Sequence, residues 1–243
     1  MDFVPPDVFG EDYLYFYESW LDDELSEAQA GLLWKILGLA AGDHVLDVPC
    51  GHGRIANRLA ARGARVTGLD ADSFFLERAR AGAEALGVEV EYVQGDMREL
   101  PWEGHFDAAV NWFTSFGYFD DDGNKAWLAT VLRTLKPGGR LALDVHSRDA
   151  FMRDRVPAHV VERDGDLLVD RHRFDIQEGR EESERWVVRD GKVRRTSYSV
   201  RFYTYTELRA LLLDAGFTAV EPVGHDGGTL TLETRRMIVI ATR

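Results

Sequence analysis

An acid and two glycines follow a short apolar segment in the first quarter of the chain. Residues 44–46 are His-Val-Leu, the acid is Asp47, and the chain then passes through Gly51 and Gly53 into a stretch from 55 to 62 that is rich in Ala, Leu and Arg. A strand that turns through glycines into a helix presents backbone N–H groups to a ligand at the helix start. This stretch therefore predicts a ligand-binding turn.

The charge of Asp47 distinguishes between the two ligand classes that use such a turn. Gly51-x-Gly53-x-x-Ala56 formally matches the dinucleotide fingerprint, and Asp70 lies at a suitable distance downstream to hold a ribose. A pyrophosphate at the helix start would be repelled by the Asp47 carboxylate, whereas an ammonium or sulfonium group would be attracted by it. S-adenosylmethionine (SAM) carries both cations, and its carboxylate can accept backbone N–H groups of the turn. The pattern therefore favours SAM, with S-adenosylhomocysteine (SAH) as its product, over NAD.

Asp47, Gly51 and Gly53 resemble the first motif of the class I SAM-dependent methyltransferases, which reads approximately acid-x-Gly-x-Gly-x-Gly. Pro49 stands where that motif has its first glycine. Because proline has no N–H, no ligand contact is expected from that amide. The resemblance extends from about residue 40 to 146 and resumes from about 204 to 243. It implies a methyltransferase of the small-molecule type with SAM as its cofactor.

Polar residues follow several of the later apolar segments, and the carboxyl ends of parallel strands share one edge of a sheet, where ligands bind. Asp70 is placed to accept both ribose hydroxyls, although it could instead cap the helix that follows Asp72. The resemblance implies that Asp96 accepts the exocyclic amine of the adenine and that Met97 lies against its ring. The expected cofactor-binding residues are Asp47, Gly51, Gly53, Asp70, Asp96, Met97 and Asn111.

The run from 111 to 119, NWFTSFGYF, is rich in aromatic residues. The resemblance implies that the wall between methyl donor and acceptor lies here, where aromatic rings would exclude water and attract the sulfonium by cation–π interaction. Phe113, taken singly, could instead be a core residue. The acidic N-terminal segment is also aromatic, and in the resembling family this segment often closes over cofactor and substrate. The expected substrate-binding residues are Tyr13, Phe113, Ser115 and Phe116.

Methyl transfer from a sulfonium is an in-line displacement that gains chiefly from alignment and from the removal of water. A base is needed only if the nucleophile is protonated. His146 follows a predicted strand and is the first candidate for a catalytic base, because histidine titrates near neutral pH. A hydrogen-bonded structural histidine is the alternative. Tyr17 is a weaker catalytic candidate.

Strand and helix patterns alternate between residues 44 and 145, which predicts a parallel sheet with helices on both faces. Two final segments, about 218 to 223 and 236 to 242, are joined only by a loop and predict an antiparallel pair. The expected fold is an α/β, Rossmann-like sheet of about seven strands with an antiparallel last strand. We expect a single methyltransferase domain over 1–243, with residues 1–40 as an N-terminal helical cap.

Asp164-Gly165, Glu178-Gly179 and Asp190-Gly191 are turn signals between segments that are rich in Val, Leu, Trp, Tyr and Arg. Such spacing predicts an antiparallel β meander, inserted over 156–203 beside the ligand-binding edge. It could be a lid over the substrate, a contact between copies of the chain in a homo-oligomer, or a stabilising flap.

Charge and composition narrow the classes of partner. The net charge of −13 argues against nucleic acid, and the N-terminus lacks the pattern of a secretory signal. No stretch is long and apolar enough to span a membrane, and a single cysteine fits a reducing compartment, so we expect a cytoplasmic protein. No metal site is expected.

The sequence therefore predicts an enzyme that transfers the methyl group of SAM to an N or O atom of a small-molecule acceptor. Three alternatives remain open at this point: an NAD(P)-dependent oxidoreductase, a non-catalytic SAM-binding protein, and an RNA or protein methyltransferase.

Overall fold

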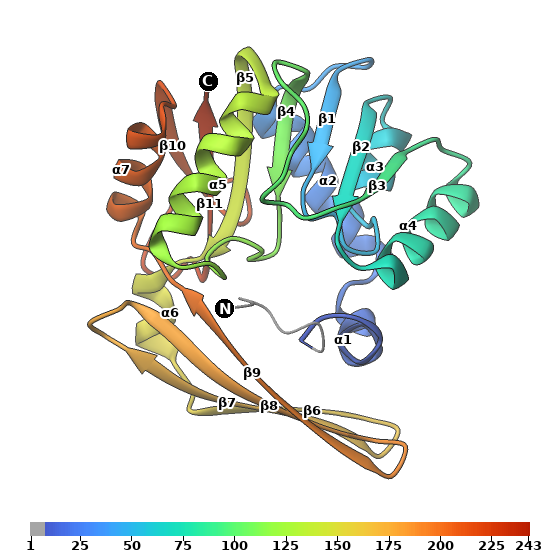
Figure 1. The fold of residues 1–243 in the computed structure, drawn as a ribbon, viewed down its shortest axis with the longest axis vertical. Coiled ribbons are helices and arrows are strands. Elements are labelled where there is room, and N and C mark those ends of the chain that lie inside the picture. The colour runs from blue at the N-terminus through green and yellow to red at the C-terminus, as the bar shows by residue number, and fades with distance from the viewer. Residues whose placement is uncertain (1–7) are drawn as a thin grey trace.

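The computed structural model describes residues 8–243, so the first seven residues of the predicted cap lie outside the described part. A seven-stranded sheet forms the body (Figure 1), in the spatial order β10-β11-β5-β4-β1-β2-β3. All neighbours pair in parallel except β11, which runs antiparallel to both β5 and β10. The strands are β1 (His44–Asp47), β2 (Arg65–Asp70), β3 (Glu91–Gln94), β4 (Phe106–Asn111), β5 (Leu135–His146), β10 (Ala219–Gly224) and β11 (Arg236–Thr242).

Helices cover both faces of this sheet, because its central strands are apolar on both sides. One core cluster joins the sheet to α5 (Asp121–Thr134) and α7 (Tyr205–Ala215). A second cluster on the opposite face joins it to α2 (Asp23–Leu37) and α3 (Ala56–Ala61). Helix α4 (Ser73–Leu86) packs beside β2 and β3. The predicted Rossmann-like sheet with an antiparallel last strand is confirmed.

The predicted meander is a separate four-stranded antiparallel sheet in the order β6-β7-β8-β9. Asp164 and Asp190 have positive φ, 52° and 55°, and the glycine after each does too, so both hairpins close through the tight turn that matches the twist of the strands. The strands are β6 (Ala158–Arg163), β7 (Asp166–Asp175), β8 (Arg180–Arg189) and β9 (Lys192–Arg201). A short helix, α6 (Arg148–Asp154), precedes β6 and was not predicted. The meander lies beyond the carboxyl ends of β1, β4 and β5 (Figure 1).

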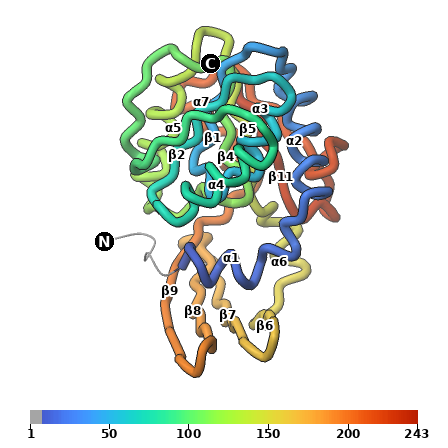
Figure 2. The backbone as a smooth tube through the Cα atoms, turned by 90° about the vertical axis from the view of Figure 1, so that its right-hand side faces the viewer, coloured from blue at the N-terminus to red at the C-terminus, as the bar shows by residue number. Residues whose placement is uncertain are grey.

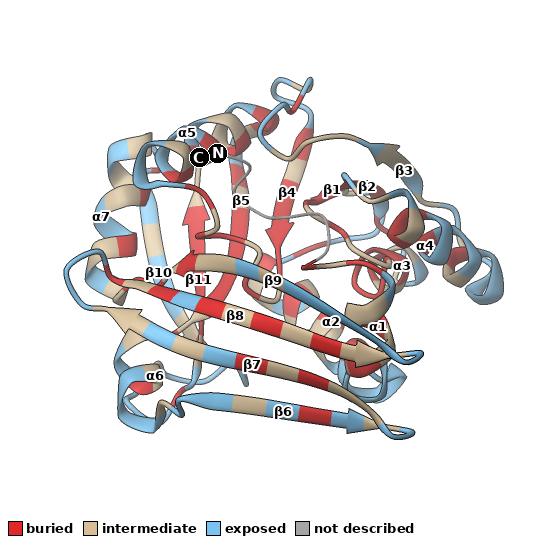
Figure 3. Ribbon diagram, turned by 60° about the horizontal axis from the view of Figure 1, so that its bottom comes forward, coloured by how far each residue is buried: buried red, intermediate tan, exposed pale blue. Residues whose placement is uncertain are grey.

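The N-terminal helix α1 (Glu11–Tyr17) lies along the meander (Figure 2) and is followed by the 3₁₀ helix η1 (Glu18–Trp20). Phe16 is buried against Val161, Leu168 and Val187. The ring of Tyr15 lies against two guanidiniums of the meander, Arg163 at 4.5 Å and Arg189 at 4.2 Å. Figure 3 shows buried residues alternating mainly with partly buried ones along β8, as expected for a sheet with one covered face. Within residues 8–243, no helix has the length and apolar character needed to cross a bilayer.

Candidate active site

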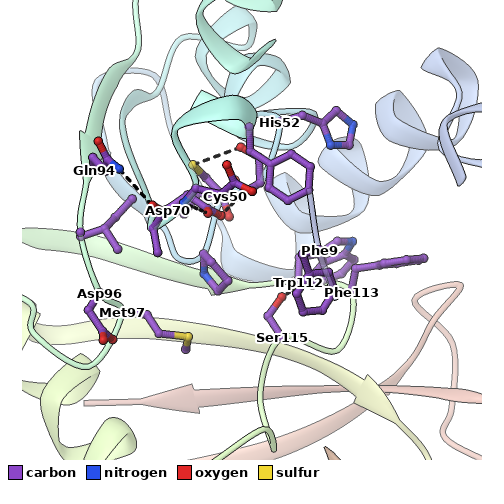
Figure 4. A pocket seen from close by; sticks show the side chains of 18 of the residues that line it. Phe9, Cys50, His52, Asp70, Gln94, Asp96, Met97, Trp112, Phe113 and Ser115 are labelled. Carbon is purple, nitrogen blue, oxygen red and sulfur yellow. Dashed lines mark hydrogen bonds between the residues drawn. The ribbon is translucent and has the colours of Figure 1, made fainter. Parts of the chain in front are cut away.

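A cavity of about 640 Å³ opens at the carboxyl ends of β1 and β2 and beside the segments that follow β3 and β4 (Figure 4). The turn after β1 forms its floor, with Asp47 and Gly51 in the lining, and Asp70 lines it at the end of β2. Asp96 and Met97 line the cavity from the loop after β3. An aromatic group that includes Phe9, Trp112 and Phe113 lines another side of it. Ligands bind at this edge of open α/β sheets.

Asp47 ends β1 as a buried carboxylate that is only 2% exposed. Its Oδ2 atom has no hydrogen-bond partner among the described residues. Burial raises the pKa of this carboxyl to about 7, although the nearby Arg54 guanidinium and a backbone N–H at Ala56 act in the opposite direction. A buried carboxylate oxygen without a donor is costly unless a bound group supplies one. The oxygen is therefore suited to a cationic donor.

Arg54, just after the glycine turn, presents the opposite charge on the same wall. Its side chain is 9% exposed, and Nη1 donates to Oε1 of Gln29 at 2.6 Å, a neutral partner. Its Nη2 atom is buried and has no hydrogen-bond partner within residues 8–243. Burial lowers the pKa of Arg54, while Tyr13 and Asp47 raise it. Sequence patterns did not point to this arginine, because its burial and its contact with Gln29, 25 positions earlier, arise only in the folded chain.

The two motif glycines have different surroundings. Gly51 has φ of 53°, lines the cavity, and donates its N–H to Asp70 Oδ2 at 2.7 Å. Gly53 has φ of 77° and is outside the cavity lining. A Cβ at Gly53 would collide with the Tyr92 hydroxyl and with the Ala79 side chain. Gly53 therefore allows α4 and β3 to approach the turn, and its predicted cofactor contact stays a prediction.

Asp70 is 8% exposed and is held in place by backbone groups. Besides the Gly51 N–H on Oδ2, its Oδ1 accepts the Asp72 N–H at 3.0 Å. Burial raises its pKa, and these backbone donors lower it. Asp72, and not Asp70, caps α4 by accepting the Phe74 N–H at 2.8 Å. Asp70 is thus fixed at the cavity with further lone pairs available to a ligand.

Asp96 lines the cavity and forms a two-pronged ion pair with Arg98, whose Nε lies 3.0 and 2.9 Å from its two oxygens. Hydrogen bonds from Arg98 lower the pKa of Asp96. Asn111, at the end of β4, is fully buried and outside the lining. Its Nδ2 donates to the Val48 carbonyl at 2.8 Å, which ties β4 to the turn after β1.

Trp112, Phe113 and Ser115 form an aromatic and hydroxyl wall in the lining. Phe113 and Thr114 both have positive φ, 64° and 61°, so the chain reverses sharply after β4. After this reversal, Phe116 points into the core, 1% exposed, with its ring 5.4 Å from that of Trp127. Phe116 is not in the cavity lining, so its predicted substrate contact has no direct support from the cavity.

The N-terminal segment contributes Phe9 and Tyr13 to the lining, and the substrate contact of Tyr13 stays a prediction. Tyr17 stacks on Tyr13 with ring centroids 4.8 Å apart and is outside the lining. Burial raises the pKa of Tyr17, and Arg185 lowers it. Its hydroxyl therefore stays protonated at neutral pH.

His146 is also outside the cavity lining. Its ring lies against two phenylalanines, Phe202 at 5.1 Å and Phe151 at 6.1 Å. Burial and the nearby Arg236 charge lower the pKa of His146 to about 3. Its imidazole is neutral at physiological pH but accepts a proton only weakly, so the base role stays a prediction. No group of three or more metal-binding side chains occurs in the described part of the chain.

Comparisons with known proteins agree with this geometry. A family model described as a methyltransferase domain matches residues 45–139. A protein of Geobacillus sp. (strain WCH70) that carries a methyltransferase name is 29% identical over 223 residues, which cover 87% of this chain and 90% of that one. A ubiquinone/menaquinone biosynthesis C-methyltransferase, UbiE of Cronobacter sakazakii, is 28% identical over 82% of this chain and 78% of its own.

A solved structure is similar over nearly the whole chain. It is SAM-bound CalS10, an amino pentose methyltransferase from Micromonospora echinaspora, with a TM-score of 0.66 and 25% identity, covering 97% of this chain and 98% of the other. The nicotinamide enzyme that the glycine spacing left open is set aside by these matches. The matched methyltransferase domain, the relatives and the solved structure together identify the chain as a SAM-dependent methyltransferase.

Proposed function

We propose that this enzyme transfers the methyl group of SAM to a nitrogen or oxygen atom of its small-molecule acceptor. The proposal on cofactor seating rests on one observation: the buried Asp47 Oδ2 and Arg54 Nη2 atoms lack partners within residues 8–243, and both residues line one cavity. An acceptor oxygen and a donor nitrogen of opposite charge match the zwitterionic amino-acid end of SAM.

We assign the rest of the cofactor along the same wall. Asp70 would accept hydrogen bonds from the ribose hydroxyls, and Asp96 and Met97 would contact the adenine. When bound, SAM supplies a methyl group activated by the sulfonium. The chain supplies orientation, and its wall of Trp112 and Phe113 excludes water from the transfer path.

Nitrogen and oxygen acceptors fit the lining better than carbon. A carbon acceptor, such as an enol or a phenol ring, must give up a proton from its hydroxyl or its carbon in the course of the reaction, and a positioned base assists this step. In the lining, burial lowers the pKa of His52 to about 4, and we assign Asp47, Asp70 and Asp96 to the cofactor. A neutral amine attacks with its own lone pair, and an oxygen acceptor that is already ionised, such as a carboxylate, likewise needs no base. The relatives named above include both a C-methyltransferase and an amino pentose methyltransferase, so the nature of the acceptor atom requires its own experiment.

Two ligands that differ only in the amino-acid end, SAH and 5′-methylthioadenosine, test whether Arg54 binds that end of the cofactor. Replacing Arg54 with Gln should weaken SAH binding by about 1.5–3 kcal/mol, because a charged hydrogen bond is lost. Binding of 5′-methylthioadenosine, which lacks the amino-acid end, should change little. Both affinities are measured by titration calorimetry. Equal loss for both ligands would mean that Arg54 does not bind the carboxylate.

A methyl-transfer screen tests the acceptor. Purified enzyme and SAM with a labelled methyl group are incubated with panels of amines, phenols, carboxylic acids and quinols, and with tRNA and peptide pools. Mass spectrometry then locates the added methyl. Label on nitrogen or oxygen of a small molecule supports the proposal, and label on carbon contradicts it.

We also propose that residues 1–40 and the meander over 156–203 together cover the acceptor, within a single methyltransferase domain. Contacts between α1 and the meander, and the presence of Phe9 and Tyr13 in the lining, support this. A role for the meander in a homo-oligomer is the second possibility. Light scattering of the intact chain and of a variant with charges on the outer face of the meander would test it.

A further inference from the structure

The segment after β4 has a conformation that its sequence disfavours. Phe113 and Thr114 are consecutive non-glycine residues in the left-handed region, with φ of 64° and 61°. Such a φ is a marked outlier for a β-branched residue such as threonine. The hydroxyl of Thr114 is also buried without a hydrogen-bond partner in the described part of the chain. Because neither side chain explains this geometry, other contacts must hold it.

Asp144, near the end of β5, provides these contacts. Its side-chain Oδ2 atom accepts the Phe113 N–H at 2.9 Å, and its backbone carbonyl accepts the Thr114 N–H at 2.9 Å. Asp144 is 1% exposed. One residue thus binds both consecutive amides of the left-handed pair and fixes the chain reversal.

Arg236, at the start of β11, holds the Asp144 carboxylate in turn. Its Nε lies 3.0 Å from Oδ1, and its Nη2 lies 2.6 Å from Oδ2. The Arg236 guanidinium is 4.7 Å from the Phe113 ring centroid, and that of Arg54 is 5.2 Å from it. The ring of Phe113 therefore lies against two guanidiniums. One belongs to Arg236, which pairs with Asp144, and the other to Arg54, which we assign to the cofactor.

We propose that Asp144 and Arg236 are positioning residues that hold Phe113 and Thr114 in the left-handed conformation and thereby shape the cofactor wall. Neither residue lines the cavity, so both act through the backbone and the Phe113 ring. The proposal deepens the assigned SAM site and rests on it. Loss of the Asp144–Arg236 ion pair should let residues 112–115 relax, and it should weaken the binding of any ligand that touches this wall.

The test compares binding of SAH and SAM to Asp144→Asn and to Asp144→Asn/Thr114→Gly. The first variant loses the ion pair, and we expect SAH affinity to fall about tenfold, as for coupled contacts in one network. Glycine tolerates positive φ, so the second variant should regain most of the lost SAH affinity. Amide exchange over 112–117, read by mass spectrometry, should speed up in the first variant and slow again in the second. Thr114→Gly alone should bind SAH nearly as wild type does.

Further ligands and variants separate the explanations. A positioning role affects the neutral sulfur of SAH and the sulfonium of SAM alike, whereas a purely electrostatic role of Asp144 would weaken SAM selectively. Asp107→Asn is the matched control, since Asp107 accepts the His44 N–H at 2.8 Å and pairs with Lys136 Nζ at 2.7 Å at the other end of the sheet. It should lower stability without changing SAH affinity.

If Asp144→Asn does not fold, the neutral pair Asp144→Asn/Arg236→Gln replaces it, with and without Thr114→Gly. Unchanged SAH affinity on breaking the pair, or a loss that Thr114→Gly does not reverse, overturns the positioning role. If wild-type enzyme bound neither SAM nor SAH, the proposed site itself would be wrong, which is a separate result.

Discussion

At the scale of single residues, the site is defined by the contacts that its charged groups lack. Asp47 and Arg54 are both at least nine-tenths buried, and each keeps one polar atom without a partner in the described chain. Protein interiors seldom leave such atoms unpaired, and exceptions concentrate where a ligand completes the set. In the unliganded protein, these unpaired buried atoms therefore lower the free energy of unfolding, and a bound ligand that pairs with them restores it.

The raised pKa of Asp47 predicts a pH dependence of cofactor binding. With a pKa of about 7 in the folded protein, Asp47 is largely protonated below that pH, and SAM should bind the ionised form. SAM affinity should therefore be constant above about pH 7.5 and should fall by up to about tenfold per pH unit below pH 6.5. Calorimetry in two buffers with different ionisation enthalpies would detect the proton released on binding.

The same group affects stability with the opposite slope. A carboxyl with a raised folded pKa stabilises the fold fully below its unfolded value of about 3.8, and this contribution is lost as pH rises towards 7. The free energy of unfolding should therefore fall with rising pH across this window, and the fall should be smaller in Asp47→Asn. If Asp47→Asn left both pH profiles unchanged, Asp47 would not be the titrating group.

The sequence identified the acids of the site but not their partners. Asp47 and Asp70 stand at strand ends, where alternating strand and helix patterns suffice to place them. Sequence patterns do not single out Arg54, because only the fold buries its guanidinium at the cavity with a neutral glutamine as its partner. The Asp144–Arg236 pair joins residues 92 positions apart and depends on the antiparallel pairing of β11 with β5.

At the scale of elements, the turn between β1 and α3 combines two tasks in neighbouring glycines. Gly51 serves the cavity, while Gly53 allows β3 and α4 to pack closely against the turn. Periodic patterns predicted the alternation of these strands and helices between residues 44 and 145. They could not predict α6, which is short, or the reversal after β4 that turns Phe116 into the core.

Alanine substitutions would separate the two glycine roles. At Gly51, φ of 53° disfavours alanine, but a Cβ would meet no atom within 4 Å, so Gly51→Ala should cost about 1–2 kcal/mol. At Gly53 the same strain is joined by collisions with Tyr92 and Ala79, so Gly53→Ala should cost more, by about 1–3 kcal/mol. Urea denaturation measures both. Equal costs would show that the packing around Gly53 adjusts freely.

At the scale of the whole molecule, the cavity is enclosed by segments from distant parts of the chain. The body supplies the floor, and the N-terminal segment supplies Phe9 and Tyr13. That segment is held by the meander, where Arg185 donates to the Val8 carbonyl at 2.9 Å and Arg189 pairs with Asp12 at 2.9 Å. Sequence patterns predicted both segments but could not establish that they contact each other.

Detaching α1 from the meander should open the cavity. Phe16 is 1% exposed against the meander, so Phe16→Ala should release α1, increase proteolysis before residue 20, and weaken SAH binding. Tyr15→Phe is the control, because it removes only the hydroxyl that donates to the Arg163 carbonyl and keeps the ring between its two arginines. Proteolysis and calorimetry on the same samples would check both. Normal SAH binding with a released α1 would mean that the N-terminal helix does not help to hold the cofactor.

The contact between Val8 and Arg185 spans 177 positions of the chain, which has a consequence for biosynthesis. During translation, the first helix emerges long before the strands on which it packs. The residues that line the cavity are made before the meander, but the contact that holds the N-terminal segment over it can form only after β8 has left the exit tunnel. A nascent chain thus cannot enclose its cofactor until most of the polypeptide has been made.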